Sequence, residues 1–281
     1  MSDAGGRATA QQLARAVGEV LAAGETACLA TLVASPPGGL LAAAGAKLLV
    51  REPGGGTTGT LGDEAFDEAV ALRAAAFLSS RREAATLGAE EFAPGRESWR
   101  AARVMFERVE PEPRVVVCGA GHVGASLARL ARAVGYGVAL IDDRADFVTR
   151  ERFPEEGIAL VAAAAGGWAA AVGAAVGTGR GVAVAVVTRG HNEDEECMRA
   201  VLAARPDYVG MIGSRRRTNI VLGRLRESGF GEDELREVRA PVGLDIGAVA
   251  PEEVALSILA EIVALRRGGT CAPLSAWRRS T

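Results

Sequence analysis

A glycine-rich hexapeptide directly after a short apolar run is the feature that most limits what this chain can fold into. The apolar run is Val115-Val116-Val117-Cys118, and the residues after it are Gly119, Ala120, Gly121, His122, Val123 and Gly124. In a strand–turn–helix unit the first glycine allows the tight turn, the second lets a diphosphate approach the backbone, and the third lets the helix pack on the strand. The free N–H groups and the dipole of that helix favour a phosphate at its start. The pattern predicts a dinucleotide-binding type of α/β domain that begins near Arg114.

Acidic residues end the next predicted strand. Asp142 stands where such domains carry the carboxylate that holds the ribose hydroxyls, and Asp143 and Arg144 follow it. Arg144 could instead meet a phosphate, so the pattern does not separate NAD from NADP. His122 either points at the ligand or is simply exposed at the helix start. The simpler alternative is that the glycines only pack a strand against a helix in a domain that binds no dinucleotide.

Strands and helices are predicted to alternate through the rest of the chain. Predicted strands cover residues 115–118, 138–142, 158–162, 182–188 and 208–212, and predicted helices cover residues 123–134, 168–176, 193–204, 214–228 and 251–267. This alternation is typical of a parallel sheet covered on both faces. We therefore expect residues 114–281 to form a Rossmann-like, doubly wound parallel sheet.

The first part of the chain, residues 1–113, is expected to form a smaller α+β domain with a linker. Predicted helices cover residues 8–23 and 63–80, predicted strands cover residues 27–34, 46–51 and 104–109, residues 53–56 form a turn, and residues 79–100 are irregular. Pro111 and Pro113 mark the domain boundary. A length of 281 residues agrees with two domains at about 100–200 residues each.

Composition excludes several classes of protein. With 32 basic and 35 acidic side chains the net charge is −3, so no overall field holds nucleic acid or an anionic membrane. The four cysteines form no CxxC pair, which argues against a disulfide framework or a structural zinc site; no metal site is expected, and reduced thiols favour a cytoplasmic protein. Residues 157–187 are long enough to span a membrane, but their glycines and alanines favour a strand, a helix and a second strand. Residues 1–23 lack the apolar core of a signal peptide.

Polar residues after the later strands are further candidates for a ligand site. Thr188 and His191 follow a predicted strand, at the carboxyl edge of the sheet where such folds bind ligands. His191 is a proton donor, a ligand contact or a neighbour of a helix cap, and Asp194 is either functional or a favourable charge in the first helical turn.

Two more segments are candidates for ligand binding. Gly213, Ser214 and Arg215 open a helix with N–H groups and a guanidinium suited to a phosphate, and either Arg216 or Arg217 is expected in solvent. Asp245 lies in a loop with glycines on either side. It either reads a pterin or base edge or belongs to a structural turn before the last helix.

From Val115 onward the chain resembles the C-terminal domain of the XdhC/CoxI family, the accessory proteins of molybdenum hydroxylases such as xanthine dehydrogenase and carbon monoxide dehydrogenase. The segments that carry the resemblance are VVVCGAGHVG, IDDRADF with ERFP, VVTRGHNEDE, YVGMIGSRRR and PVGLDIGAVAPEEVALSILAEIVA. The first half resembles the family's first domain more loosely, in LATLV, GAKLLV and GTLGDEAFDEAV.

The resemblance implies a protein that binds molybdenum cofactor, protects it during maturation and sulfuration, and delivers it to an apo molybdenum hydroxylase. It also implies a homodimer and a cysteine desulfurase as a possible second partner. Molybdopterin carries a phosphate and its dinucleotide form a diphosphate, and either suits the glycine turn. Some members have a cysteine in a glycine-rich segment where this chain reads GTLGDEAF at residues 59–66, which puts direct sulfur handling there in doubt. Cys118 stands next to the turn, where a buried small hydrophobe is the simpler interpretation.

An NAD(P)-dependent oxidoreductase on the same fold is the alternative function. Its acid or base would be His191, Asp194 or Tyr208. The chain has no recognisable tyrosine–lysine pairing, since Lys47 is its only lysine. A nucleotide-sensing module without chemistry is a third hypothesis that the sequence does not separate from the first.

Overall fold

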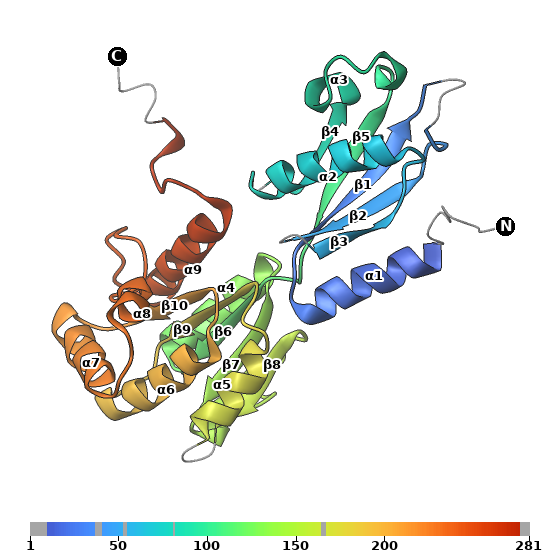
Figure 1. The fold of residues 1–281 in the computed structure, drawn as a ribbon. Helices are drawn as coiled ribbons and strands as arrows, with labels where there is room; N and C mark the ends of the chain where they lie inside the picture. The colour runs from blue at the N-terminus through green and yellow to red at the C-terminus, as the bar shows by residue number, and fades with distance from the viewer. Residues whose placement is uncertain (1–9, 37–40, 53–54, 81, 164–166, 276–281) are drawn as a thin grey trace. The chain divides into compact units, whose positions relative to one another are not determined.

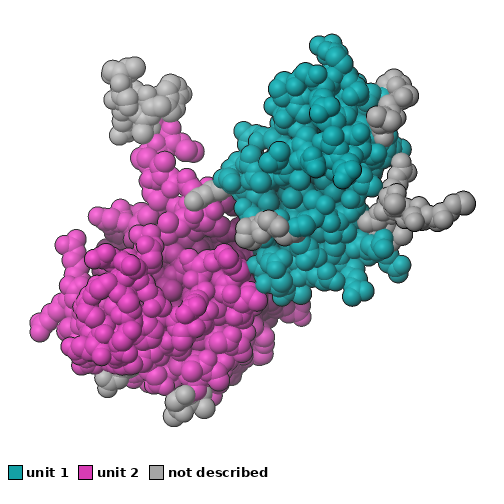
Figure 2. Space-filling view, in the orientation of Figure 1, with its two compact units in different colours: residues 1–111 teal, residues 112–281 magenta. Residues whose placement is uncertain are grey.

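The computed structural model describes residues 10–36, 41–52, 55–80, 82–163 and 167–275. The chain divides into two compact units, Met1–Pro111 and Glu112–Thr281, which Figure 2 shows in different colours. The division falls within the Glu-Pro-Glu-Pro segment at residues 110–113. Each unit has its own hydrophobic core.

The first unit is a five-stranded antiparallel sheet with helices on both faces (Figure 1). The strand order is β3-β2-β1-β5-β4, and the elements are α1 (Ala10–Ala23), β1 (Ala27–Ala34), β2 (Lys47–Arg51), β3 (Gly55–Gly59), α2 (Glu64–Leu78), β4 (Ala84–Gly88), α3 (Ala89–Phe92), the 3-10 turn η1 (Glu97–Trp99) and β5 (Arg103–Val109). On one face α1 buries Leu13 and Val20 with Leu49 of β2. On the other face α2 buries Phe66 together with Phe106 of β5. Both faces are covered because side chains alternate along each strand.

The structure corrects two expectations for this unit. Residues 79–100, expected to be irregular, contain β4, α3 and η1. The expected turn at residues 53–56 overlaps β3, which begins at Gly55, while residues 53–54 lie outside the described residues. The strand sequences AATLG and GGTTG have weak β-propensity, so pairing with β5 and with β2 decides their conformation. A neighbour far along the chain leaves no local pattern.

The second unit is a five-stranded parallel sheet, which confirms the predicted Rossmann-like fold. Its elements are β6 (Arg114–Cys118), α4 (His122–Ala133), β7 (Gly137–Asp142), the 3-10 turn η2 (Ala145–Phe147), β8 (Ile158–Ala162), α5 (Trp168–Val176), β9 (Val182–Val186), α6 (His191–Ala204), β10 (Tyr208–Met211), α7 (Arg215–Glu227), α8 (Glu232–Glu237) and α9 (Pro251–Arg267). The strand order is β10-β9-β6-β7-β8, so β6 is the central strand and β7 and β9 flank it. The short helix α8 was not anticipated from the sequence.

Helices cover both faces of this parallel sheet (Figure 1). Val115 and Val117 of β6 face the layer formed by α4 and α9, whereas Val116 and Cys118 face the layer formed by α5, α6 and α7. All four side chains are fully buried. A strand buried on both faces explains the uninterrupted apolar run in the sequence.

The apolar stretch at residues 157–187 forms β8, α5 and β9, with residues 164–166 outside the described part. In the described residues, no helix combines the length and the apolar character that a membrane span requires.

Candidate functional site

The glycine turn joins β6 to α4, and its three glycines have different surroundings. Gly119 has a φ of +115°, and a Cβ there would lie 2.6 Å from the carbonyl oxygen of Val187. A Cβ on Gly124 would lie 1.8 Å from the carbonyl oxygen of Gly119. Both positions therefore need glycine for the fold. A Cβ on Gly121 would meet nothing within 4 Å, so the middle of the turn borders open space.

The N-terminus of α4 has unsatisfied donors. Gly121 is its N-cap, and no side chain caps it. In contrast, the Ser214 hydroxyl accepts a hydrogen bond from the N–H of Arg217 in α7, and the Glu253 carboxylate accepts two at the start of α9. The first turn of a helix leaves N–H groups without partners, and the helix dipole adds partial positive charge there. The open face of the turn therefore suits an anion, as the sequence predicted.

Asp142, at the end of β7, is turned inward against this loop and is almost fully buried. Its Oδ2 accepts hydrogen bonds from the N–H of Ala120 at 2.6 Å and from Arg144 Nη2 at 3.0 Å. Its Oδ1 accepts from the N–H of Arg144 at 2.9 Å and from Arg144 Nε at 2.8 Å. A carboxylate has about four lone-pair sites, and all are used. Burial raises the pKa of Asp142, but these hydrogen bonds outweigh it and lower the pKa to about 2.

Asp143 and Arg144 make separate contacts beside Asp142. The Asp143 carboxylate pairs with Arg189 Nη2 at 3.1 Å, and its pKa is raised by burial and by the neighbouring Asp142 carboxylate. The Arg144 guanidinium lies over the ring of Phe147, 3.4 Å from its centroid. Because Arg144 is also paired with Asp142, its guanidinium is held in place on two sides.

A second buried cluster forms where β9 ends. Asp194 of α6 is fully buried and accepts hydrogen bonds from the Thr188 hydroxyl and from Arg217 Nε, the latter at 2.6 Å. Arg217 Nη2 also lies 2.5 Å from the Asp194 carboxylate. Of the two arginines considered for solvent, Arg216 is exposed and Arg217 is not. His191 is the first residue of α6, and its side chain lies outside the described part.

Ser214 and Arg215 follow β10 at the same edge of the sheet. Gly213 has a φ of +152°, and the Ser214 hydroxyl accepts its hydrogen bond from within α7. Arg215 is exposed at the start of that helix. Asp245 is exposed in the loop before α9 and has no hydrogen bond or ion pair with any residue that the structure describes. Glu253, rather than Asp245, caps α9.

The structure does not bring Tyr208 to the glycine turn. It is the first residue of β10 and lies level with Ala183 and Val115, at the amino ends of the strands, whereas the turn follows the carboxyl end of β6. Its hydroxyl donates to Glu261 Oε2 at 2.9 Å, and burial beside Glu261 raises the pKa of Tyr208. The sequence placed Tyr208 among candidate acids because strand order, which sets its distance from the turn, is not visible in a local pattern.

The two cysteines near the turn are part of the core. Cys118 and Cys197 are fully buried. Burial and the neighbouring Cys118 raise the pKa of Cys197, so it stays a protonated thiol. In the described residues no three His, Cys, Asp or Glu side chains gather closely enough to hold a metal ion.

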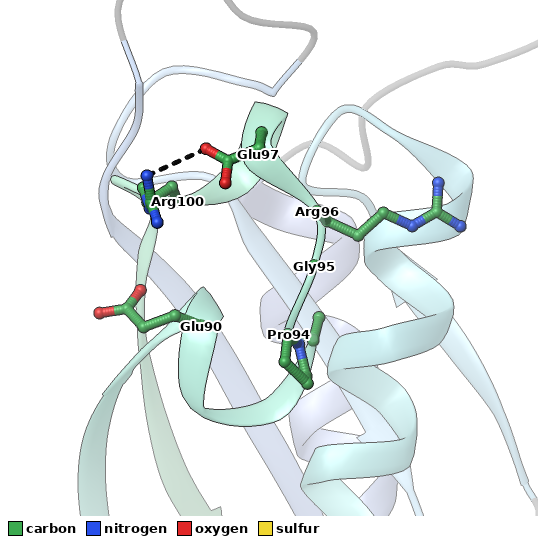
Figure 3. Close-up of a pocket in the computed structure, with 7 residues that line it drawn as sticks. Glu90, Pro94, Gly95, Arg96, Glu97 and Arg100 are labelled. Atoms are coloured by element: carbon green, nitrogen blue, oxygen red, sulfur yellow. Dashed lines mark ion pairs between the residues drawn. The ribbon is translucent and has the colours of Figure 1, made fainter.

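A small hollow lies in the first unit around α3 and η1 (Figure 3). It measures about 120 Å³ and is lined by Glu90, Ala93, Pro94, Gly95, Arg96, Glu97 and Arg100. Arg100 pairs with Glu97 at 3.1 Å. Sites for organic cofactors usually occupy about 300–1,000 Å³, so this hollow is too small for one.

Sequence reasoning did not single out Arg189 or Arg217 as site residues. Both stand inside motifs that drew attention, next to Thr188 and near Ser214. Their carboxylate partners, however, are 46 and 23 residues away along the chain. Only the folded chain brings these charges together.

Comparisons with known proteins agree with this architecture. The chain is 30% identical over 227 residues to "Uncharacterized protein YqeB" of Escherichia coli (strain K12), which covers 79% of this chain and 40% of that protein. It is 29% identical over 164 residues to a probable component of the xanthine dehydrogenase of Bacillus subtilis (strain 168), covering 58% of this chain and 46% of that protein. It is 34% identical over 84 residues to "Molybdenum cofactor insertion chaperone PaoD" of Escherichia coli (strain K12), covering 30% and 26%. The chain thus spans less than half the length of the curated relatives it matches.

A solved structure and a family model also match. The solved structure is described as a xanthine dehydrogenase from Bacillus halodurans, with 16% sequence identity, a TM-score of 0.47, and coverage of 94% of this chain and 98% of that one. The family model is described as the XdhC Rossmann domain and matches residues 115–262. These residues run from β6 into α9 and include the glycine turn, Asp142, Arg189 and Ser214. The chain therefore belongs to the XdhC family.

Proposed function

We propose that this protein is an accessory protein that binds molybdenum cofactor and aids its maturation and insertion into a molybdenum hydroxylase of the xanthine dehydrogenase or carbon monoxide dehydrogenase type. The observation that carries the proposal is the family match over a turn with an open Gly121 and an uncapped α4. The names of two relatives, a molybdenum cofactor insertion chaperone and a probable component of a xanthine dehydrogenase, support the same role.

The residues around the turn fit the phosphate end of such a cargo. Molybdopterin carries a phosphate, and its dinucleotide form carries a diphosphate. The N–H groups at the start of α4 would hold that group, with positive charge nearby on Arg189 and Arg215. His122 is exposed beside the turn, and Asp245 is exposed in the loop before α9, so both are accessible to a ligand.

The geometry gives less support to an NAD(P)-dependent oxidoreductase. Reading a ribose would require Asp142 to release hydrogen bonds that use its whole acceptor capacity. Asp194 and Tyr208, two of its candidate acids, are engaged with Arg217 and Glu261. The proposal therefore places the phosphate at the turn and assigns Asp142 to the shape of the turn.

The proposed partners follow from the proposed role. They are an apo molybdenum hydroxylase, a cysteine desulfurase that supplies sulfur to the cofactor, and a second copy of this chain in a homodimer. Cys118 is not the sulfur carrier in this proposal, because it is fully buried. Sedimentation of the purified protein at micromolar concentration tests the homodimer.

The test is the molybdenum content of the client enzyme. A strain that lacks this protein should make a folded hydroxylase with a low ratio of molybdenum to protein, and wild-type protein should restore the ratio. Gly121→Asp should not restore it, because a carboxylate at the N-cap satisfies the orphan donors of α4 from within the chain and repels a phosphate.

Gly231→Asp is the matched control. Gly231 is also an N-cap glycine, with a φ of −70° against −69° at Gly121, and a Cβ there also meets nothing within 4 Å. Both variants should be at least as stable as wild type, since aspartate is a good N-cap residue. Equal molybdenum loading in the deletion strain and its parent would remove the proposal and favour the oxidoreductase, whose test is turnover of NAD(P)H.

A further inference from the structure

An ion pair joins the loops on either side of the glycine turn. β7 and β9 flank β6 in the sheet, so the residues that follow them lie to the two sides of the turn that follows β6. Asp143 comes directly after β7, Arg189 comes shortly after β9, and their side chains meet at 3.1 Å. Neighbouring strands are about 4.8 Å apart, so this pair spans about two strand spacings at the edge where the turn begins.

The pair is easier to exchange than the other arginine contacts at this edge. Arg144 is fixed by the buried Asp142 and by Phe147, and Arg217 is fixed by the buried Asp194. The Arg189 side chain is 50% exposed, and its second carboxylate neighbour, Glu193, lies 3.9 Å away.

The carboxylate that holds Arg189 is itself in an unfavourable place. Asp143 lies beside the ionised Asp142, and its only other cation in the described part is Arg144, with Nε 3.9 Å from its Oδ1. A phosphate carries more charge than a carboxylate and accepts the guanidinium fork in the same bidentate way. A phosphate at the start of α4 would therefore compete well for Arg189.

We propose that Arg189 is an anion-binding residue of the glycine-turn site and that Asp143 is its built-in competitor, which the phosphate of the ligand replaces. This inference rests on the proposed function and adds to it a residue that selects for charge. Asp143 guards the turn against weakly charged ligands, because only an anion that outcompetes it gains the guanidinium. Neutral ligands leave the pair closed.

The proposal makes the two members of the pair act with opposite signs. Asp143→Asn frees the guanidinium and should tighten binding of inorganic diphosphate by about two- to fivefold, the range expected for a part-exposed ion pair. Arg189→Gln removes a charge-assisted hydrogen bond and should weaken binding by about tenfold or more. In the Asp143→Asn/Arg189→Gln double variant, the gain from losing Asp143 should largely vanish, because its partner is absent.

The experiment is calorimetric titration of the full chain with inorganic diphosphate at low salt. Arg226→Gln and Asp233→Asn are charge-matched controls from exposed ion pairs of the same unit, and they should leave the affinity within about twofold of wild type. Weaker binding by Asp143→Asn, an unchanged affinity in Arg189→Gln, or no diphosphate binding by wild type would each overturn the inference. A purely structural pair would make both single variants weaker and less heat-stable.

Molybdenum loading of the client enzyme separates this inference from the proposed function. If diphosphate binding follows the opposite-sign pattern but the deletion strain loads its hydroxylase normally, the proposed function fails and the role of Arg189 stands. If the deletion strain loads poorly and Arg189→Gln binds diphosphate as wild type does, the reverse holds.

Discussion

Asp142 holds the glycine turn in shape through a buried, charged side chain. Its carboxylate receives the N–H of Ala120 inside the turn and the backbone and side chain of Arg144 outside it. Burial alone would raise the pKa of Asp142, yet these donors lower it to about 2. The folded state therefore favours the ionised form, and protonation removes a stabilising contact.

We predict that Asp142 contributes on the order of 2 kcal/mol to the free energy of unfolding at neutral pH, since its pKa falls from 3.8 to about 2 on folding. When folding lowers the pKa of a carboxyl, the contribution is complete above the unfolded value and is lost as the pH falls through the folded value. In urea denaturation Asp142→Asn should be less stable than wild type at about pH 6, and the difference should shrink between about pH 4 and pH 2.

The control for this measurement is Asp233→Asn, whose side chain is fully exposed. It should match wild type at every pH. A stability difference for Asp142→Asn that stays constant down to about pH 2 would contradict the prediction.

At the scale of elements, a buried cluster ties two helices to the end of a strand. Asp194 of α6 binds the Thr188 hydroxyl after β9 and the Arg217 guanidinium from α7. Arg217 Nη2 also donates to the carbonyl oxygen of Thr188 at 3.4 Å. The cluster sets where α6 and α7 begin, and so sets the position of Ser214 and Arg215 at the edge of the sheet.

We expect Arg217→Gln to lower the free energy of unfolding by about 3–5 kcal/mol, because it leaves the buried Asp194 carboxylate without its cation. Its neighbour Arg216 is exposed, so Arg216→Gln should change stability by no more than about 0.5 kcal/mol. Urea denaturation measures both. Amide hydrogen exchange should also speed up in the first turn of α6 in Arg217→Gln alone. Equal losses in the two variants would show that the Asp194–Arg217 pair does not carry this stability.

At the scale of the whole molecule, all the residues of the candidate site belong to one unit. The glycine turn, Asp143, Arg189 and Ser214 lie within Glu112–Thr281, which has its own core and its own sheet. The first unit contributes a separate antiparallel sheet. Phosphate binding is therefore assigned to the second unit by itself.

We predict that a fragment of residues 112–281 folds and binds inorganic diphosphate within about twofold of the full chain. Circular dichroism and a cooperative thermal transition establish that the fragment is folded, and calorimetry then compares the affinities. A folded fragment that binds more than about tenfold weaker would assign part of the site to the first unit.

The sequence by itself determined the fold class of the second unit and the position of its turn. Both depend on short-range patterns: Val115 to Cys118 are apolar on both faces of a buried strand, and Gly119 and Gly124 occupy places where a Cβ would collide with the backbone. Weak strands such as β3 and β4 escaped detection, because their pairing partners, not their own residues, stabilise them.

Only the tertiary structure decided what each charged side chain does. Asp142 looked like a ribose-binding residue until its 22-residue-distant contact with Ala120 was seen, and Asp143 and Arg189 are 46 residues apart. Tyr208 looked available until strand pairing placed it at the amino end of the sheet. The physical reason is that a carboxylate or guanidinium takes its role from the partner it meets, and the order β10-β9-β6-β7-β8 chooses those partners.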